Sequence, residues 1–234
     1  MTVAVSHPLP GVVQALLDRP GSRNAIDLNM VGRLHEVVGD HEARVIVLGS
    51  TSEEALSSGA DLKLSDGDRA EVSRQLYRLY ETMRTTSAII IVALSGHAVG
   101  GGAQLVVASD FTVAGPDATI RFRGPGHGIA VGAWALGGLV GRGRAIDLAL
   151  SMRPVSAKEA LEIGLIQRID ADPLAHANSL AEEITSLGPS AVAAVKRIVG
   201  IPDSLQALAA ERDHNEGWDG AIPSSAENGP DLTG

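Results

Sequence analysis

The stretch SGHAVGGGAQ at residues 95–104 is the one that decides the fold of this chain. An apolar run at residues 88–94 leads into it, and a second apolar run at residues 105–108 follows at once. Three consecutive glycines cost backbone entropy, so they persist where the backbone must approach something closely or adopt positive φ. Between a strand and the start of a helix, they leave N–H groups unpaired at the positive end of the helix dipole. We therefore predict a strand–turn–helix junction that binds an oxyanion or a phosphate.

Composition narrows the class of protein. The 234 residues fit one domain with a full core, and the absence of cysteine excludes disulfides and thiolate chemistry. No HExxH or CxxC motif is present, so no metal site is expected. The net charge of −9 argues against a nucleic-acid partner, although a local cationic patch would still accept a phosphorylated small molecule. With no long apolar run and no export pattern, we expect a cytoplasmic protein without a membrane segment.

Strand and helix patterns alternate along the chain. Strands apolar on both faces favour parallel βαβ units, and Asp27 or Asn24 is a candidate helix cap. We expect a core at residues 1–199, a helical segment at 200–219 and a disordered tail at 220–234. Strands are predicted at residues 12–17, 45–48, 88–94 and 111–114, and helices at 28–40, 69–85, 101–109, 156–163, 173–187, 190–199 and 204–215.

A second loop complements the glycines. The sequence SSGADLK at residues 57–63 follows a predicted strand and precedes a predicted helix, and Gly59-Ala60 again allows a close backbone approach. Two backbone N–H donors from two such junctions match what a thioester oxygen needs when it becomes an enolate. Donors of this kind contribute about 3–4 kcal/mol each to transition-state stability.

Five motifs of this chain resemble those of the crotonase, or enoyl-CoA hydratase/isomerase, superfamily. The resemblance spans residues 12–199 and keeps the family's motif order. The motifs are RPGSRNA (19–25), SSGADLK (57–63), SGHAVGGGAQ (95–104), DFTVA (110–114) and VSAKEALEIGLI (155–166).

The resemblance implies an α/β fold, a spiral of ββα units followed by a helical C-terminal region. It also implies a homotrimer or a hexamer built as a dimer of trimers. The implied ligand is an acyl-CoA thioester, with coenzyme A as part of the substrate and no separate cofactor. Ala60 and Gly101 would supply the two N–H groups of an oxyanion hole. Further substrate-binding positions carried over are Arg23, Ser58, Asp61, Lys63, Gly100 and Trp134.

Three of those residues have a simpler alternative. Arg23 and Lys63 match positions near the CoA phosphates, but each is equally compatible with a solvated surface charge. Trp134 fits either the wall of an acyl pocket or the core.

The chain departs from the family at the two glutamates that a hydratase uses. The first position is Gln104, whose amide binds water but does not accept a proton near neutral pH. The second falls on Gly124 without gaps, or on Gly126 when Pro125 is aligned. The segment at 128–141 is also about three residues shorter than in typical members. Standard hydration is therefore not expected.

Other side chains are candidates to replace the missing chemistry. His127 lies beside the lost position and is a candidate base, or else a loop histidine exposed to solvent or bonded to a carbonyl. Gln104 either orients a water or a carbonyl, or merely caps a helix turn. Arg121 and Arg123 face either an anionic acyl group or solvent.

These observations favour an acyl-CoA-binding enzyme that stabilises a thioester enolate. Isomerisation, C–C hydrolysis and thioester hydrolysis are the reactions left open. The alternative is a non-catalytic acyl-CoA-binding protein or subunit that kept the fold and lost the chemistry. A ligand other than CoA is the third possibility.

Overall fold

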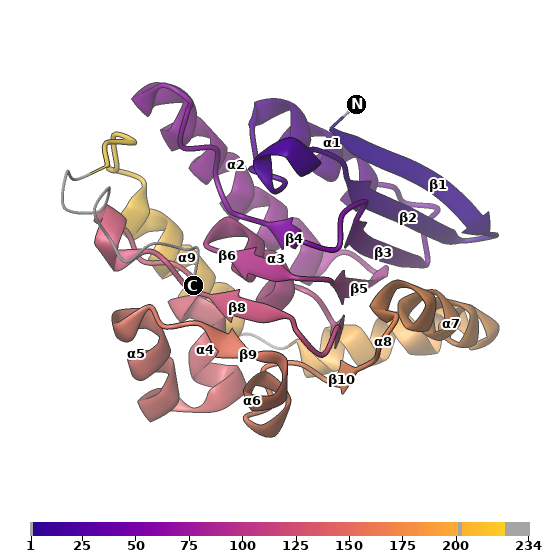
Figure 1. Cartoon of the computed structure of the whole chain (residues 1–234). Coiled ribbons are helices and arrows are strands. Elements are labelled where there is room, and N and C mark those ends of the chain that lie inside the picture. Colours follow the sequence, from indigo (N-terminus) through magenta and orange to yellow (C-terminus); the bar gives the residue numbers. More distant parts are fainter. Residues whose placement is uncertain (1, 201–202, 223–234) are drawn as a thin grey trace.

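The computed structural model describes residues 2–200 and 203–222, which form two β-sheets with helices packed around them (Figure 1). The larger sheet has the strand order β1-β2-β3-β5-β7-β10, and the smaller sheet has the order β4-β6-β8-β9. The larger sheet comprises β1 (Val3–Leu9), β2 (Val12–Leu17), β3 (Val45–Ser50), β5 (Ile89–Leu94), β7 (Phe111–Ala114) and β10 (Arg168–Ile169). The smaller sheet comprises β4 (Ala55–Ser57), β6 (His97–Val99), β8 (Thr119–Arg121) and β9 (Val155–Ser156).

A ββα unit recurs along the chain. The successive units are β3-β4-α2, β5-β6-α3 and β7-β8-α4, and each gives its first strand to the larger sheet and its second to the smaller one. Neighbouring strands from successive units pair in parallel. The predicted α/β spiral of ββα units is therefore confirmed. Antiparallel pairing occurs where β1 meets β2 and where β9 meets β8.

The inner strands of the larger sheet, β2, β3, β5 and β7, are buried on both faces because they are mostly apolar on both faces. In β3, Ile46 and Leu48 join the main core, whereas Val45 and Val47 join a second core on the opposite face. Helices α1 to α3 contribute to the main core, and α7 covers the second. This arrangement explains why the strand sequences show no polar alternation.

Helix boundaries follow their caps. Asp27 rather than Asn24 caps α1, because its carboxylate accepts a hydrogen bond from Met30 N at 2.8 Å. Ser65 caps α2 and starts it earlier than the predicted residue 69. The helices are α1 (Leu28–Val38), α2 (Asp66–Thr85), α3 (Gly101–Ala108), α4 (Ala133–Val140), α5 (Arg142–Ser151), α6 (Ala157–Glu162), α7 (Pro173–Ser186), α8 (Pro189–Val199) and α9 (Asp203–Asn215). Short 3₁₀ turns cover Pro20–Ser22 and Pro125–His127.

The C-terminal helices pack on the same chain. A buried ion pair between Lys196 and Asp110, with N–O separation of 2.7 Å, fixes α8 to the core. Helix α9 packs against α2 and α4. The predicted segment at 200–219 and tail at 220–234 fall partly outside the described residues, since 201–202 and 223–234 are not among them. That division stays a prediction.

Candidate active site

A cavity of about 720 Å³ lies between α2, the N-terminus of α3, the smaller sheet and the loop at 123–131. Most of the residues assigned to the site from the sequence line this cavity, whereas Trp134 does not. Those that line it are Arg23, Ser58, Ala60, Asp61, Lys63, Gly100, Gly101, Gln104 and His127. The motifs at 19–25, 57–63 and 95–104 are thus brought together at one place.

The two glycine-containing loops meet on one wall of the cavity. Gly59 has φ of +92°, and a Cβ added to it would lie 2.9 Å from Val99 O and 3.4 Å from Gly101 N. Only glycine fits this approach. Neither Ala60 N–H nor Gly101 N–H has an acceptor among the hydrogen bonds of the described residues. Two unpaired donors therefore lie close together and face the cavity.

The loop at 19–25 supports this wall from behind. Asn24 is buried with φ of 54°, and its Oδ1 accepts a hydrogen bond from Arg19 N at 2.7 Å. Ser57 Oγ donates to Asn24 O at 2.8 Å and accepts from Gly59 N at 3.1 Å. Arg19 also forms an ion pair with Asp61 at 3.0 Å. Asp61, predicted to bind substrate, thus has its carboxylate committed to holding the loop.

Gln104 presents a donor to the cavity rather than an acceptor. Its Oε1 accepts hydrogen bonds from Gly132 N at 3.2 Å and from Trp134 Nε1 at 3.0 Å. The amide NH₂ is what remains for the cavity, so Gln104 has no means of acting as a base. Trp134 is buried behind Gln104 and stacks on Tyr80. The prediction that Trp134 binds substrate directly is therefore corrected, and its place is in the core.

The second glutamate position is closed by backbone. A Cβ added to Gly124 would lie 2.7 Å from both Ile129 O and Val131 N, so no side chain fits there. At Gly126 the nearest atoms, on Met152, would be 3.5 Å away, which leaves room for a side chain that this chain lacks. In either alignment, the position that a hydratase fills with its second glutamate carries no carboxylate.

A buried carboxylate does lie behind the cavity, on α9. Tyr77 lines the cavity, and its hydroxyl donates to Glu211 Oε1 at 2.8 Å. Glu211 also accepts hydrogen bonds from Gly132 N and Trp134 N, each at 2.9 Å. Burial raises the pKa of the Glu211 carboxyl, and these donors oppose the rise. Burial and the adjacent Glu211 raise the pKa of Tyr77 strongly, so the tyrosine keeps its proton.

Sequence reasoning did not assign Tyr77 or Glu211 to the site. The two residues are 134 positions apart, and neither belongs to a family motif. Only the packing of α9 against α2 and α4 brings them together.

Basic side chains also line the cavity. Arg121 and Arg123 come from β8 and the segment after it, and His127 comes from the following 3₁₀ turn. Burial, together with the charges of Arg123 and Arg69, lowers the pKa of His127. The imidazole is therefore neutral near pH 7, which is the state that a general base requires.

Comparison with known proteins identifies the family. A sequence profile described as enoyl-CoA hydratase/isomerase matches residues 9–230. The chain belongs to the enoyl-CoA hydratase/isomerase family. This family member is 34% identical over 206 residues to a protein described as a probable enoyl-CoA hydratase (echA6) of Mycobacterium leprae, a match covering 84% of this chain and 82% of the relative.

Solved structures agree with the assignment. An enoyl-CoA hydratase/isomerase from Mycobacterium paratuberculosis superimposes with a TM-score of 0.83 and 25% identity, covering 97% of each chain. A monofunctional enoyl-CoA isomerase from M. smegmatis gives a TM-score of 0.72 and 25% identity, covering 92% of this chain and 98% of that one. The superfamily predicted from the five motifs is confirmed.

The residues that the structure describes lack two further features. No helix there combines the length and apolar character that a membrane crossing requires. The same residues contain no group of three or more His, Asp or Glu side chains arranged to hold a metal ion.

Proposed function

We propose that this family member binds acyl-CoA thioesters and stabilises their enolate with Ala60 N–H and Gly101 N–H. The observation that carries the proposal is the pair of unpaired donors on one wall of the cavity, held there by backbone packing at Gly59. Preorganised donors of this type stabilise a developing oxyanion more than a neutral carbonyl. Coenzyme A enters as part of the substrate, and no separate cofactor takes part.

The reaction in this proposal is not standard hydration. Gln104 offers only N–H groups to the cavity, and the backbone fills the space at Gly124. His127, neutral near pH 7, is the base of the proposed mechanism, and the Gln104 NH₂ orients a carbonyl or a water. Isomerisation begins with removal of an α-proton, and hydrolysis begins with activation of a water molecule, so a general base such as His127 suits the first step of either reaction.

A second candidate is a protein that binds acyl-CoA without transforming it. It is favoured by the hydrogen bonds that occupy Gln104 Oε1 and hold the Tyr77 hydroxyl on Glu211. In that case the two N–H donors serve only to bind the thioester carbonyl.

Exchange of the α-protons of pentanoyl-CoA in D₂O separates the two candidates, because it reports enolate formation whatever the later reaction. The enzyme proposal predicts protein-dependent exchange that falls about 100-fold in His127→Gln, with the dissociation constant nearly unchanged. The matched control is His41→Gln, at an exposed histidine outside the cavity. Binding with neither exchange nor release of free coenzyme A would establish the second candidate instead.

Hydration of crotonyl-CoA tests the departure from hydratase chemistry. We expect no turnover in the range of roughly 1–1000 s⁻¹ typical of enzymes. Turnover in that range would overturn the argument from Gln104 and Gly124.

The proposal also covers the binding of the CoA phosphates and the assembly of the chain. Arg23 and Lys63, which line the cavity, bind the CoA phosphates. The chain assembles as a homotrimer or hexamer, and it acts in the cytoplasm. The assembly is supported by exposed apolar side chains on α4 and α5, namely Leu139, Ile146 and Leu150. Light scattering on the protein eluted from a size-exclusion column measures the molar mass of the oligomer directly. The mass of a monomer would refute the proposed assembly.

A further inference from the structure

The cavity wall is positively charged in a chain that is acidic overall. The net charge of the chain is −9, yet the one carboxylate among the described lining residues, Asp61, is already paired with Arg19. An excess of positive charge along a cavity favours an anionic ligand. The lining cations are Arg23, Lys63, Arg69, Arg121 and Arg123.

These arginines differ in whether their donors are already used. Arg69 Nε donates to Gly220 O at 2.8 Å, and its other nitrogens bind Leu62 O, Leu64 O and Asp66. Arg69 therefore holds the protein's own backbone. Arg123, in contrast, has no hydrogen bond or ion pair with any other part of the chain that the structure describes. Arg121 commits only its Nε, to Met152 O.

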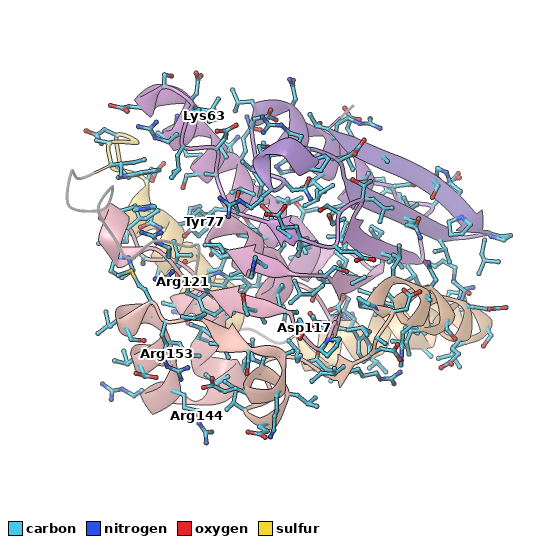
Figure 2. All side chains as sticks on the ribbon, in the orientation of Figure 1. Lys63, Tyr77, Asp117, Arg121, Arg144 and Arg153 are labelled. Carbon is cyan, nitrogen blue, oxygen red and sulfur yellow. The ribbon has the colours of Figure 1, made fainter. Side chains whose placement is uncertain are left out.

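The available arginines lie beside the thioester position. Gly100 N donates to Arg121 O at 2.9 Å, and Gly100 immediately precedes the proposed donor Gly101. Figure 2 shows Lys63 and Arg121 on opposite sides of Tyr77. The phosphates of coenzyme A lie at the far end of the pantetheine arm from the thioester. Arg121 and Arg123 line the cavity, and the backbone of Arg121 lies beside Gly100, so these two arginines start nearer to the proposed thioester position than to the far end of the pantetheine arm.

We propose that Arg123, together with Arg121, binds a carboxylate carried by a short acyl chain, so that the ligand is a coenzyme A half-thioester of a dicarboxylic acid. The inference rests on the proposed function, because it places the thioester carbonyl at Ala60 and Gly101. A planar guanidinium with free donors matches a carboxylate through two parallel hydrogen bonds.

The surroundings fit such a ligand. Leu76, Ile129 and Val131 supply apolar lining for the methylenes between thioester and carboxylate. Burial and the charge of Arg123 lower the pKa of Arg121, which reflects two cations close together without a counter-charge. A bound carboxylate would relieve that repulsion.

Calorimetric titration with glutaryl-CoA, its methyl ester, pentanoyl-CoA and free coenzyme A tests the inference. Pentanoyl-CoA has the same number of acyl carbons as glutaryl-CoA and no carboxylate, and the methyl ester keeps the shape while removing the charge. We expect glutaryl-CoA to bind about tenfold more tightly than either neutral thioester, the gain typical of a charge-assisted hydrogen bond. In Arg123→Gln glutaryl-CoA and the neutral thioesters should bind with about equal affinity, and the dissociation constant of pentanoyl-CoA should be unchanged.

Two further variants keep the test decisive. Arg144→Gln removes an exposed arginine on α5, far from the cavity, and should leave every affinity unchanged (Figure 2). Arg123→Lys keeps the charge and loses the paired hydrogen bonds, so it should retain only part of the preference. Circular dichroism confirms that each variant is folded.

The outcomes separate this inference from the proposed function. Equal or weaker binding of glutaryl-CoA by the wild type would overturn the inference and leave the proposed function standing. An equal loss of affinity for all four compounds in Arg123→Gln would show a phosphate contact and would also overturn it. Absence of binding by all four would refute the proposed function itself.

Discussion

Two walls of the cavity differ in what they are made of. The wall at Gly59-Ala60 and Gly100-Gly101 presents backbone N–H groups, and its geometry is set by glycine packing. The wall at Gln104 and Gly124 belongs to side chains in a hydratase, but here one is an amide and the other is absent. The backbone part of the site has kept the family pattern, and the side-chain part has not.

The contrast has a physical reason. A backbone donor is held by the fold itself, so altering it requires altering the packing of α3 against β4 and β6. A side chain is exchanged by one substitution with little effect on the fold. In this chain a carboxylate lies behind Gln104, that of Glu211 on α9, and it shares the Gly132 N–H with Gln104 Oε1. This carboxylate is buried in the core and does not line the cavity.

The largest expected effect tests the backbone wall. A Cβ added to Gly102 would lie 2.6 Å from Ser57 O, so Gly102→Ala must push α3 away from β4 and separate Gly101 from Ala60. We expect a loss of about 3 kcal/mol in the free energy of unfolding by urea, and loss of thioester binding in calorimetry.

The matched control for that variant is Gly137→Ala. Gly137 also lies within a helix, α4, but nothing lies within 4 Å of its added Cβ. Alanine there should be neutral or stabilising. If both variants lost the same stability, the close approach to Ser57 would not be the cause, and the argument from Gly102 would be wrong.

The next effect tests the buried carboxylate of Glu211 behind Gln104. In Gln104→Glu, two carboxylates would compete for the Gly132 N–H, and their repulsion raises the pKa of the pair in the folded protein. When the carboxyl pKa is higher in the folded state than in the unfolded state, the folded state binds the proton more tightly, and its stability falls as the pH rises. The free energy of unfolding of the variant should therefore decrease from about pH 5 to about pH 8. We expect it to be about 2 kcal/mol less stable than the wild type at pH 8 in urea unfolding.

A double-mutant cycle isolates that repulsion. Gln104→Glu combined with Glu211→Gln again leaves one carboxylate, so the double variant should recover stability beyond the sum of the single changes. Strict additivity would mean that the two positions do not interact. Neither variant should hydrate crotonyl-CoA, because Gly124 and Gly126 still supply no second carboxylate.

Much of this molecule could be predicted from the sequence, and the limits have physical causes. The inner strands of the larger sheet are mostly apolar runs of four to six residues, and β2 and β7 match their predicted ranges, whereas β1 and β10 at its edges were not predicted. The strands of the smaller sheet, such as β6 (His97–Val99), are two or three residues long and give no usable pattern. Backbone donors were predictable because glycine spacing encodes them locally.

The side-chain network was not predictable for the opposite reason. Tyr77 and Glu211 meet only because α9 docks between α2 and α4, and no local spacing encodes that contact. The difference in space between Gly124, which is closed, and Gly126, which has room for a side chain, likewise depends on the folded structure and is not contained in the sequence.

The smallest effect concerns the charge on the cationic wall. Burial, with Arg123 and Arg69, lowers the pKa of His127 in the folded protein, whereas the unfolded chain binds a proton near the ordinary value of about 6.5. The unfolded state therefore takes up a proton first as pH falls, and the wild type should lose stability relative to His127→Gln between about pH 7.5 and about pH 5.5. Urea unfolding at both pH values measures the difference, which should be smaller than the two effects above. In Arg123→Gln one source of repulsion is gone, so the loss on acidification should shrink. If Arg123→Gln lost as much stability on acidification as the wild type, the Arg123 guanidinium would not act on His127, and Arg123 would not belong to the group of basic side chains around His127.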